Sequence, residues 1–480
     1  MTGQVPTTNR GAEGVKRAPS LVQSVTPLVA MALFLGVGYG VLRLPAEVLL
    51  IAAAAVAGVI AHRLGYSYKE IENGVLNSMM KGMPAMLIVI VVGALIGSWI
   101  ACGTIPMLIS YGLKLISPAL FLVTACLVCS VVSVVTGTSY GTVGTLGVAL
   151  IGIAQGLDIP LGQAAGAIVA GAYFGDKLSP FSDTTNLAPV AARANLFDHI
   201  RHTLWTTTPA WLIGLAVYLA LGFMSSRSAA VSIDVTTSIS EAISADFRFH
   251  WLLLAPPVIT LFAAVRRYPV IPGMLVSSAV AVALALGLQG LDIKTAVSSM
   301  ATGYVSVTDN EIVDTLLTRG GMANMMRVTL IAFCAFAFGG IMQAAGMLEV
   351  LLERLVKVAD STGKIVASTV LASITTAVVT GSSFLSILIP GELFAPVYRR
   401  RNLAAKNLSR TTEDSGTVVV PLVPWSIAGV FMAGTLGVKT LSYAPWAIMC
   451  YLGFVFALAY GFTGFAIAPR VADDETVPGS

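Results

Sequence analysis

A polar segment interrupts an apolar part of the chain between Gly175 and Pro189. It holds two aspartates, Asp176 and Asp183, together with a lysine, two serines, two threonines and an asparagine. In a membrane span such residues are costly unless they face protein or a water-filled cavity, and helix-breaking residues beside them leave backbone carbonyls that need partners. The segment is therefore expected to form an ion site built on unwound backbone.

Oxygen-bearing side chains continue directly after the second aspartate. Na⁺ is a hard cation that takes oxygen ligands, so the carboxylate, hydroxyl and amide oxygens of this run predict a cation site. The run consists of Asp183, Thr184, Thr185 and Asn186. We assign Na⁺ to Asp183, Thr184 and Asn186. The structural alternative is that Asp183 and Thr184 only cap the following helix, but capping does not require the second carboxylate at Asp176.

Two roles are open for Asp176. It carries protons if burial favours its neutral form, or it is a fixed ion ligand if a cation holds it ionised. The neighbouring Lys177 supplies such a cation. We interpret Lys177 as a structural counter-ion, with the binding of an organic anion as the alternative. His199 and His202 are expected to flank the next loop and have no metal-ligand spacing.

The composition identifies the class of protein that must position these residues. Of 480 residues, 56% are hydrophobic and only 11% are charged, whereas soluble domains carry about 25% charged residues. Continuous apolar runs of roughly 17 to 22 residues indicate membrane-spanning helices and not a β-barrel. We therefore predict an all-α polytopic membrane protein whose partner is the lipid bilayer. The net charge of +4 is small and dispersed, so nucleic acid is not expected as a partner.

Motifs for enzymatic chemistry are not found in the sequence. It contains no nucleotide-binding loop and no hydrolase or redox motif, so neither an ATP-driven pump nor an enzyme is predicted. No cofactor is expected beyond the ions that are transported. The five cysteines all lie in apolar runs, where burial as small hydrophobic residues is the expected role.

Hydropathy divides the chain into fourteen apolar segments. Several are short or interrupted by glycine and proline, so 11 to 14 of them are expected to be membrane segments. They lie near residues 25–42, 47–61, 84–102, 118–135, 141–156, 160–175, 204–223, 249–264, 270–288, 326–346, 363–380, 384–398, 417–435 and 443–463.

Basic residues in the short loops set the orientation, because such loops are retained in the cytoplasm. The cytoplasmic markers are Arg63, Arg201, Arg266, Arg267 and the basic run from Arg399 to Arg410. Passing the chain through the membrane between these markers places the acidic segments at Asp158, Glu241 and Asp309 on the extracytoplasmic side. Both termini are then cytoplasmic, with residues 1–23 as a disordered tail and residues 466–480 as a second tail.

An internal repeat organises the apolar segments. Four patterns recur in the same order, namely Ser78-Met79 as Ser299-Met300, Gly97-x5-Gly103 as Gly340-x5-Gly346, residues 136–140 as residues 380–384, and Asp176 as Asp414. Each copy contains seven of the fourteen segments. Because seven is an odd number, the second copy must enter the membrane from the opposite side. We therefore predict two inverted repeats, at residues 24–223 and 249–465, joined by an extracytoplasmic linker at residues 224–248.

Broken helices in inverted repeats bring substrate and ion sites near the bilayer midplane. Four candidate breaks combine glycine or proline with hydroxyl side chains, at residues 136–145, 175–189, 380–391 and 413–425. Their polar groups are candidates for holding a small organic solute. This candidate set consists of Thr136, Thr138, Ser139, Thr380, Ser382, Ser383, Glu413, Ser415 and Thr417.

The fourth break begins with two acidic residues, Glu413 and Asp414. Asp414 is favoured for function because it occupies the repeat position of Asp176. For Glu413 two interpretations stay open. It either takes part in the site or interacts with the N-terminal dipole of the apolar helix that follows.

Four motifs resemble the NhaC family of Na⁺/H⁺ antiporters, within the larger group of inverted-repeat ion transporters. They are GTSYGTVGTLGVAL at residues 137–150, YFGDKLSPFSDTTNLAP at 173–189, EIVDTLLTRGGM at 311–322 and EDSGTVVVPLVPWSIAGVFMAGTLGV at 413–438. The resemblance implies a Na⁺-linked secondary carrier. The positions that it implicates in ion chemistry are Asp176, Ser179, Ser182, Asp183, Thr184 and Asp414.

The resemblance leaves two functions open. The first is Na⁺/H⁺ antiport by alternating access, with Na⁺ and H⁺ competing for the carboxylates. The alternative is Na⁺- or H⁺-coupled transport of an amino acid or carboxylate, including malate/lactate exchange, because similar carriers perform it. Ser382 and Ser383 favour the alternative, since related carriers often have an acidic residue there. A bacterial-type inner membrane and a homodimer are also implied.

Overall fold

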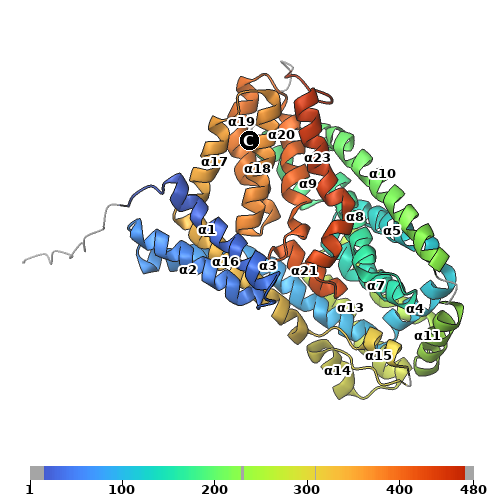
Figure 1. The fold of residues 1–480 in the computed structure, drawn as a ribbon. Coiled ribbons are helices and arrows are strands. Elements are labelled where there is room, and N and C mark those ends of the chain that lie inside the picture. Colours follow the sequence, from blue (N-terminus) through green and yellow to red (C-terminus); the bar gives the residue numbers. More distant parts are fainter. Residues whose placement is uncertain (1–15, 229–231, 267, 309, 471–480) are drawn as a thin grey trace, which may run out of the picture.

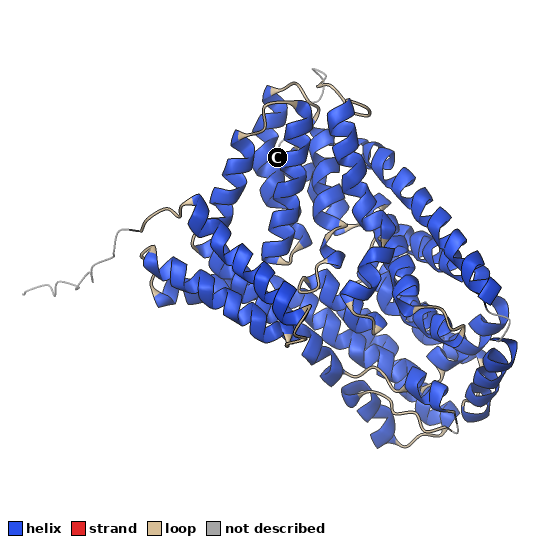
Figure 2. Ribbon diagram, viewed as in Figure 1, coloured by secondary structure: helices blue, strands red, loops and turns tan. Residues whose placement is uncertain are grey.

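The apolar segments fold as helices in a computed structural model, which describes residues 16–228, 232–266, 268–308 and 310–470. Figures 1 and 2 show helices joined by loops throughout the described part of the chain, without strands. Arg267 and Asp309, which entered the predicted orientation, lie outside the described residues, as do residues 1–15 and 471–480 of the predicted tails. Helix α1 begins at Leu21, within the predicted N-terminal tail.

The first copy of the predicted repeat contains ten α-helices in the described residues, and each predicted apolar segment coincides with one of them or with a helix and a short helical extension. Helix α10 starts eight residues before the segment predicted from hydropathy. The helices are α1 (Leu21–Leu33), α2 (Ala46–Arg63), α3 (Tyr68–Ala101), α4 (Thr104–Leu115), α5 (Phe121–Thr136), α6 (Ser139–Thr142), α7 (Val148–Gly156), α8 (Leu161–Leu178), α9 (Asp183–Ala192) and α10 (Leu196–Ser228).

The predicted linker and the second copy are helical as well. They comprise α11 (Ser232–Asp246), α12 (Ala255–Val265), α13 (Val270–Leu284), α14 (Ile293–Thr302), α15 (Glu311–Leu317), α16 (Met322–Ala344), α17 (Met347–Lys357), α18 (Thr362–Thr380), α19 (Ser383–Arg400), α20 (Ala405–Thr412), α21 (Ile427–Leu436), α22 (Thr440–Tyr443) and α23 (Ile448–Thr463).

Eight helices in the described part of the chain are long and apolar enough to cross a membrane, and three bent pairs bring the number to eleven. One bent pair joins residues 405–422 to α21 at an angle of 45°. These features confirm the predicted class, an all-α polytopic membrane protein with discontinuous helices. The largest cluster of buried apolar side chains includes residues of α3, α5, α8, α16 and α21, so the same core supports both copies.

Two matched glycines occupy equivalent positions in the two copies. Gly103 follows α3 with a φ of 91° and Gly346 follows α16 with a φ of 68°, and each begins the next helix. Left-handed backbone of this kind is open to glycine at little cost. The pattern Gly-x5-Gly therefore marks the same sharp turn in both copies.

The second matched pair of glycines ends α5 and α18. Gly137 and Gly381 have φ values of 69° and 64°, and the next residue in each copy caps the following helix with its hydroxyl. Thr138 accepts a hydrogen bond from the amide of Gly141, and Ser382 accepts one from the amide of Leu385. Residues 136–140 and 380–384 thus share one local geometry. The opposite orientation of the two copies stays a prediction.

Small residues allow α3 to pack closely on α14 and on the start of α16, and α3 and α16 lie side by side in Figure 1. A Cβ atom added at Gly97 would lie 1.9 Å from the carbonyl oxygen of Ser299. Glycine at such helix contacts permits close packing of membrane helices. The tight backbone contact explains why the matched glycine is present in the first copy.

Replacing Gly97 by alanine is expected to lower the free energy of unfolding by about 1 to 3 kcal/mol, because the added methyl group forces the helices apart. Thermal unfolding of the purified protein in detergent measures the change. Gly287→Ala is the matched control, since nothing lies within 4 Å of an added Cβ there. Equal effects of the two substitutions would contradict the close packing at Gly97.

Candidate ion-binding site

The helix breaks lie in contact within each copy. A Cβ atom added at Gly137 would lie 2.7 Å from the carbonyl carbon of Phe181, in the break between α8 and α9. In the second copy a Cβ at Gly381 would lie 3.2 Å from the Cα of Ser426, in the break before α21. The amide of Ile427 also donates to the carbonyl of Gly381 at 3.0 Å. Each copy therefore brings two broken segments to one place.

A buried ion pair joins the two copies. Lys177 near the end of α8 pairs with Asp414 Oδ1, which lies in a π-helical turn formed by Glu413–Thr417. Both side chains are completely buried. The hydroxyl of Thr206, on α10, donates to the same carboxylate oxygen at 3.0 Å. Lys177 thus neutralises the carboxylate of the opposite copy, as expected of a structural counter-ion.

A second buried network surrounds Glu413. Its Oε1 accepts a hydrogen bond from the hydroxyl of Thr185 at 3.0 Å, and its Oε2 lies 2.8 Å from Nε2 of His199. The other ring nitrogen of His199 lies 2.9 Å from the hydroxyl of Ser409. Thr185 also lies within hydrogen-bond distance of the carbonyl of Asp176, at 3.1 Å. One threonine therefore connects the break of the first copy to an acidic residue of the second.

Asp176 differs from Asp414 in its partners, although the two occupy matched positions. Its Oδ2 accepts a hydrogen bond from the hydroxyl of Ser139 at 2.7 Å, and the residue is 8% exposed. The ion pairs among the described residues do not include Asp176. A buried carboxylate without a cation must be neutralised, by a proton or by a bound metal ion. Asp414 is therefore balanced by a lysine, whereas Asp176 has no cationic partner among the described residues.

The predicted Na⁺ ligands lie around the break between α8 and α9 but are not equally buried. Asp183 starts α9 and is exposed, whereas Thr184 and Asn186 are half-buried. The amide nitrogen of Asn186 donates to the carbonyls of Pro180 and Ser182, at 2.9 and 2.7 Å. These two hydrogen bonds stabilise the conformation of the unwound backbone between α8 and α9.

The two serines of this break are structural anchors. Ser179 donates to the carbonyl of Val134 at 2.7 Å, and Ser182 caps α9 by accepting from the amide of Thr185. The cap is therefore Ser182, so the structural alternative, in which Asp183 and Thr184 cap the helix, is wrong by one residue. The hydroxyl of Thr184 lies 3.2 Å from that of Ser182.

The hydroxyls predicted to hold an organic solute are not gathered in one place. Thr136 and Thr138 line a small cavity of about 30 Å³ together with residues of α12 and α13. In the second copy Ser382 caps α19 beside a half-buried Ser383. Others satisfy helical carbonyls, since Thr380 donates to Thr376 and Ser415 donates to Thr411. The buried hydroxyl of Thr417 has no hydrogen-bond partner.

Comparison with known proteins gives the same family as the motifs. The Na⁺/H⁺ antiporter family matches residues 171–465. The chain belongs to this family. It is 44% identical over 457 residues to an uncharacterized Na⁺/H⁺ antiporter of Haemophilus influenzae, covering 94% of this chain and 98% of the relative. It is 38% identical over 428 residues to the Na⁺/H⁺ antiporter NhaC of Alkalihalophilus pseudofirmus, covering 89% and 92%. A malate-2H⁺/Na⁺-lactate antiporter of Bacillus subtilis is 36% identical over 449 residues, covering 93% and 96%.

Several charged groups of this Na⁺/H⁺ antiporter family member are placed differently from what the sequence suggested. Glu413 follows α20 in a π-helical turn, so it does not face a helix N-terminus. His199 and His202 lie on α10 and are buried, where a loop was expected. Arg410, counted among the loop charges, is completely buried in α20 and donates to the carbonyl of Ala466 at 2.8 Å.

The polar face of α10 was not among the residues predicted from the sequence. His199, Thr203, Thr206 and Thr207 are completely buried. Thr203, Thr206 and Thr207 follow His199 by four, seven and eight residues, which places all four along one side of a helix. That periodicity was a usable signal. It was hidden because the predicted apolar segment began only at residue 204.

Proposed function

We propose that the protein exchanges Na⁺ for H⁺ across a membrane by alternating access, with Asp176 binding either ion. The observation that carries the proposal is the buried carboxylate of Asp176, which has a serine partner but no ion pair among the described residues. An ionised carboxylate in this setting is costly. A proton or a Na⁺ ion each removes that cost, and the two cannot occupy the same oxygen together.

Competition of this kind couples the two ion flows. The carboxylate gives up one ion only when it binds the other. Movement of Na⁺ in one direction is therefore exchanged for movement of H⁺ in the opposite direction. Asp183, Thr184, Thr185 and Asn186 lie directly after the break and supply further oxygens on the Na⁺ path. Asp414 supports the site indirectly, because it pairs with the ammonium group of Lys177, the residue next to Asp176 in the chain. Ser179 and Ser182 hold the backbone between α8 and α9 in its unwound conformation.

A second candidate function is exchange of a small carboxylate coupled to Na⁺ or H⁺. It is favoured by the similarity over 93% of this chain to a malate-2H⁺/Na⁺-lactate antiporter, and by serines at positions 382 and 383 instead of an acidic residue. The solute would then contact polar groups at the tips of α6 and α19. We place the protein in a bacterial-type inner membrane with both termini in the cytoplasm, as the loop charges predict.

Transport by the purified protein in liposomes tests the proposal. With an imposed pH gradient and no organic solute, added Na⁺ is expected to dissipate the gradient, and acidification should raise the apparent KM for Na⁺ without changing the maximal rate. A fluorescent pH indicator inside the liposomes reports the flux. Na⁺-dependent uptake of labelled malate or lactate, with no proton flux when the organic solute is absent, would contradict Na⁺/H⁺ antiport and support the second candidate function.

A further inference from the structure

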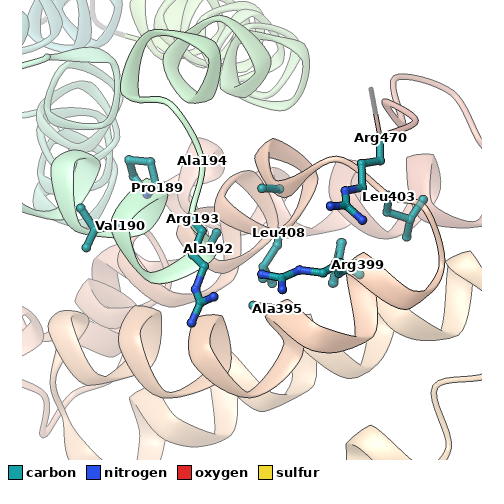
Figure 3. Close-up of a pocket in the computed structure, with 12 residues that line it drawn as sticks. Pro189, Val190, Ala192, Arg193, Ala194, Ala395, Arg399, Leu403, Leu408 and Arg470 are labelled. Atoms are coloured by element: carbon teal, nitrogen blue, oxygen red, sulfur yellow. The ribbon is translucent and has the colours of Figure 1, made fainter. Parts of the chain in front are cut away.

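A cavity with arginines in its wall lies beside the ion site, between α9, α19 and the start of α20. It has a volume of about 550 Å³, within the usual range for small-molecule sites. Figure 3 shows Arg193 at the end of α9 and Arg399 from α19 projecting into the same space, with Arg470 along its edge. An adjoining cavity of about 360 Å³ shares Arg193 and Arg399, and Glu392 contributes the one carboxylate of its wall.

Arg193 and Arg399, which line both cavities, have no acidic partner among the residues that the structure describes. The ion pairs among the described residues include neither Arg193 nor Arg399, and Glu392 leaves the combined wall with an excess of positive charge. Like charges around one cavity repel, and guanidinium groups match the geometry of phosphate and carboxylate groups. The cavity is therefore suited to an anion.

The backbone at Arg193 supports a dedicated role for its side chain. Arg193 has a φ of 62° at the end of α9, where glycine or asparagine would be relaxed and a long side chain is disfavoured. An arginine kept in such a conformation suggests that its charge serves the cavity. The strained position lies ten residues after Asp183 on the same helix, so the cavity and the ion site share one element.

The remaining wall is apolar. Pro189, Val190, Ala395, Leu403 and Leu408 line the cavity, and Val190 is 71% exposed. An exposed apolar side chain next to a basic pocket offers a surface for acyl chains, and basic pockets between the helices of membrane proteins bind anionic lipid head groups. A ligand with a phosphate group and an apolar part would satisfy both halves of the wall.

We propose that this cavity is a binding site for the phosphate head group of an anionic phospholipid, held by Arg193 and Arg399. The bound lipid contacts α9 and α19 together and so stabilises the packing of the break that carries the ion site. A free organic phosphate has the same charged group, but it would leave the apolar half of the wall uncovered. The proposal does not depend on which ions the protein exchanges.

Equilibrium binding of a short-chain fluorescent phosphatidylglycerol to the full-length protein in detergent tests the site. Saturable binding is expected, with phosphatidylcholine of the same chain length unable to compete. The double variant R193Q/R399Q should bind roughly 30-fold more weakly, from the usual contribution of two basic residues near an anionic head group. R193K/R399K keeps the charge and should lose less than about tenfold.

The matched control is R400Q/R401Q, which removes the same charge from exposed neighbours that do not line the cavity. It should weaken binding less than about threefold. Equal losses in the two double variants would overturn the site in favour of general attraction to a basic surface. Competition by glycerol phosphate as strong as that of the lipid would assign the cavity to a soluble organic phosphate. Absence of saturable binding would also overturn the proposal.

Discussion

Replacing Lys177 by methionine is expected to destabilise the protein by about 3 to 5 kcal/mol, because it leaves the carboxylate of Asp414 buried without its cation. Neither side chain of this pair is exposed to solvent, and the second oxygen of Asp414 has no hydrogen-bond partner. The remaining hydrogen bond from Thr206 cannot balance a full charge. Thermal unfolding in detergent measures the loss.

The double variant K177M/D414N separates the ion pair from the individual side chains. Removing both charges should restore most of the stability, since a neutral pair avoids the desolvation of two ions. The same variant should retain Na⁺/H⁺ exchange if Asp176 is the carboxylate that binds the transported ions. A double variant that is as unstable as the single one would show that Lys177 does not act by neutralising Asp414.

The matched control for this charge pair lies on the surface. Lys364 and Asp360 form an ion pair of 2.7 Å in which both side chains are more than half exposed. Lys364→Met should cost less than about 0.5 kcal/mol, because water already screens both charges. Comparable losses at Lys177 and Lys364 would mean that burial does not govern the effect.

Replacing Asp176 by asparagine is expected to abolish exchange, so that liposomes with the variant behave like empty ones. Asparagine can still accept the hydrogen bond from Ser139, but it neither titrates nor attracts a cation. The folded state should be as stable as that of the unsubstituted protein or more stable, because a buried charge is removed. Loss of transport together with loss of folding would leave the Asp176 proposal unsupported, and retained transport would overturn it.

Ion binding gives a readout for Asp176 that does not need turnover. Na⁺ bound to the folded protein raises its stability by about 2.7 kcal/mol at a concentration of 100 Kd, and D176N should lose this stabilisation. Asp183→Asn is the companion variant. Because Asp183 is exposed, its charge is screened by salt, so we expect a higher apparent KM for Na⁺ with exchange still measurable. An unchanged KM would remove Asp183 from the Na⁺ path.

Local sequence was enough to locate the helices and their breaks. Apolar runs dictate membrane helices wherever water is absent, and each of the four segments rich in glycine, proline and hydroxyls contains a break. The repeat was predicted from matched residues such as Gly137 and Gly381, and these two share a left-handed backbone that few other residues adopt. Asp176 and Asp414 could be recognised because they are acidic residues within apolar sequence.

What the sequence by itself determined is therefore the class of protein and its family motifs, and it singled out Asp176 and Asp414 as candidates for the site. Only the tertiary structure decided how these charges are distributed. Lys177 lies beside Asp176 in the chain but pairs with Asp414, 237 residues away, and His199 reaches Glu413 across 214 residues. Hydropathy and spacing report local preference, whereas a buried charge is stabilised by whichever partner the packing brings near. Packing thus gives Asp414, and not Asp176, the lysine as its partner.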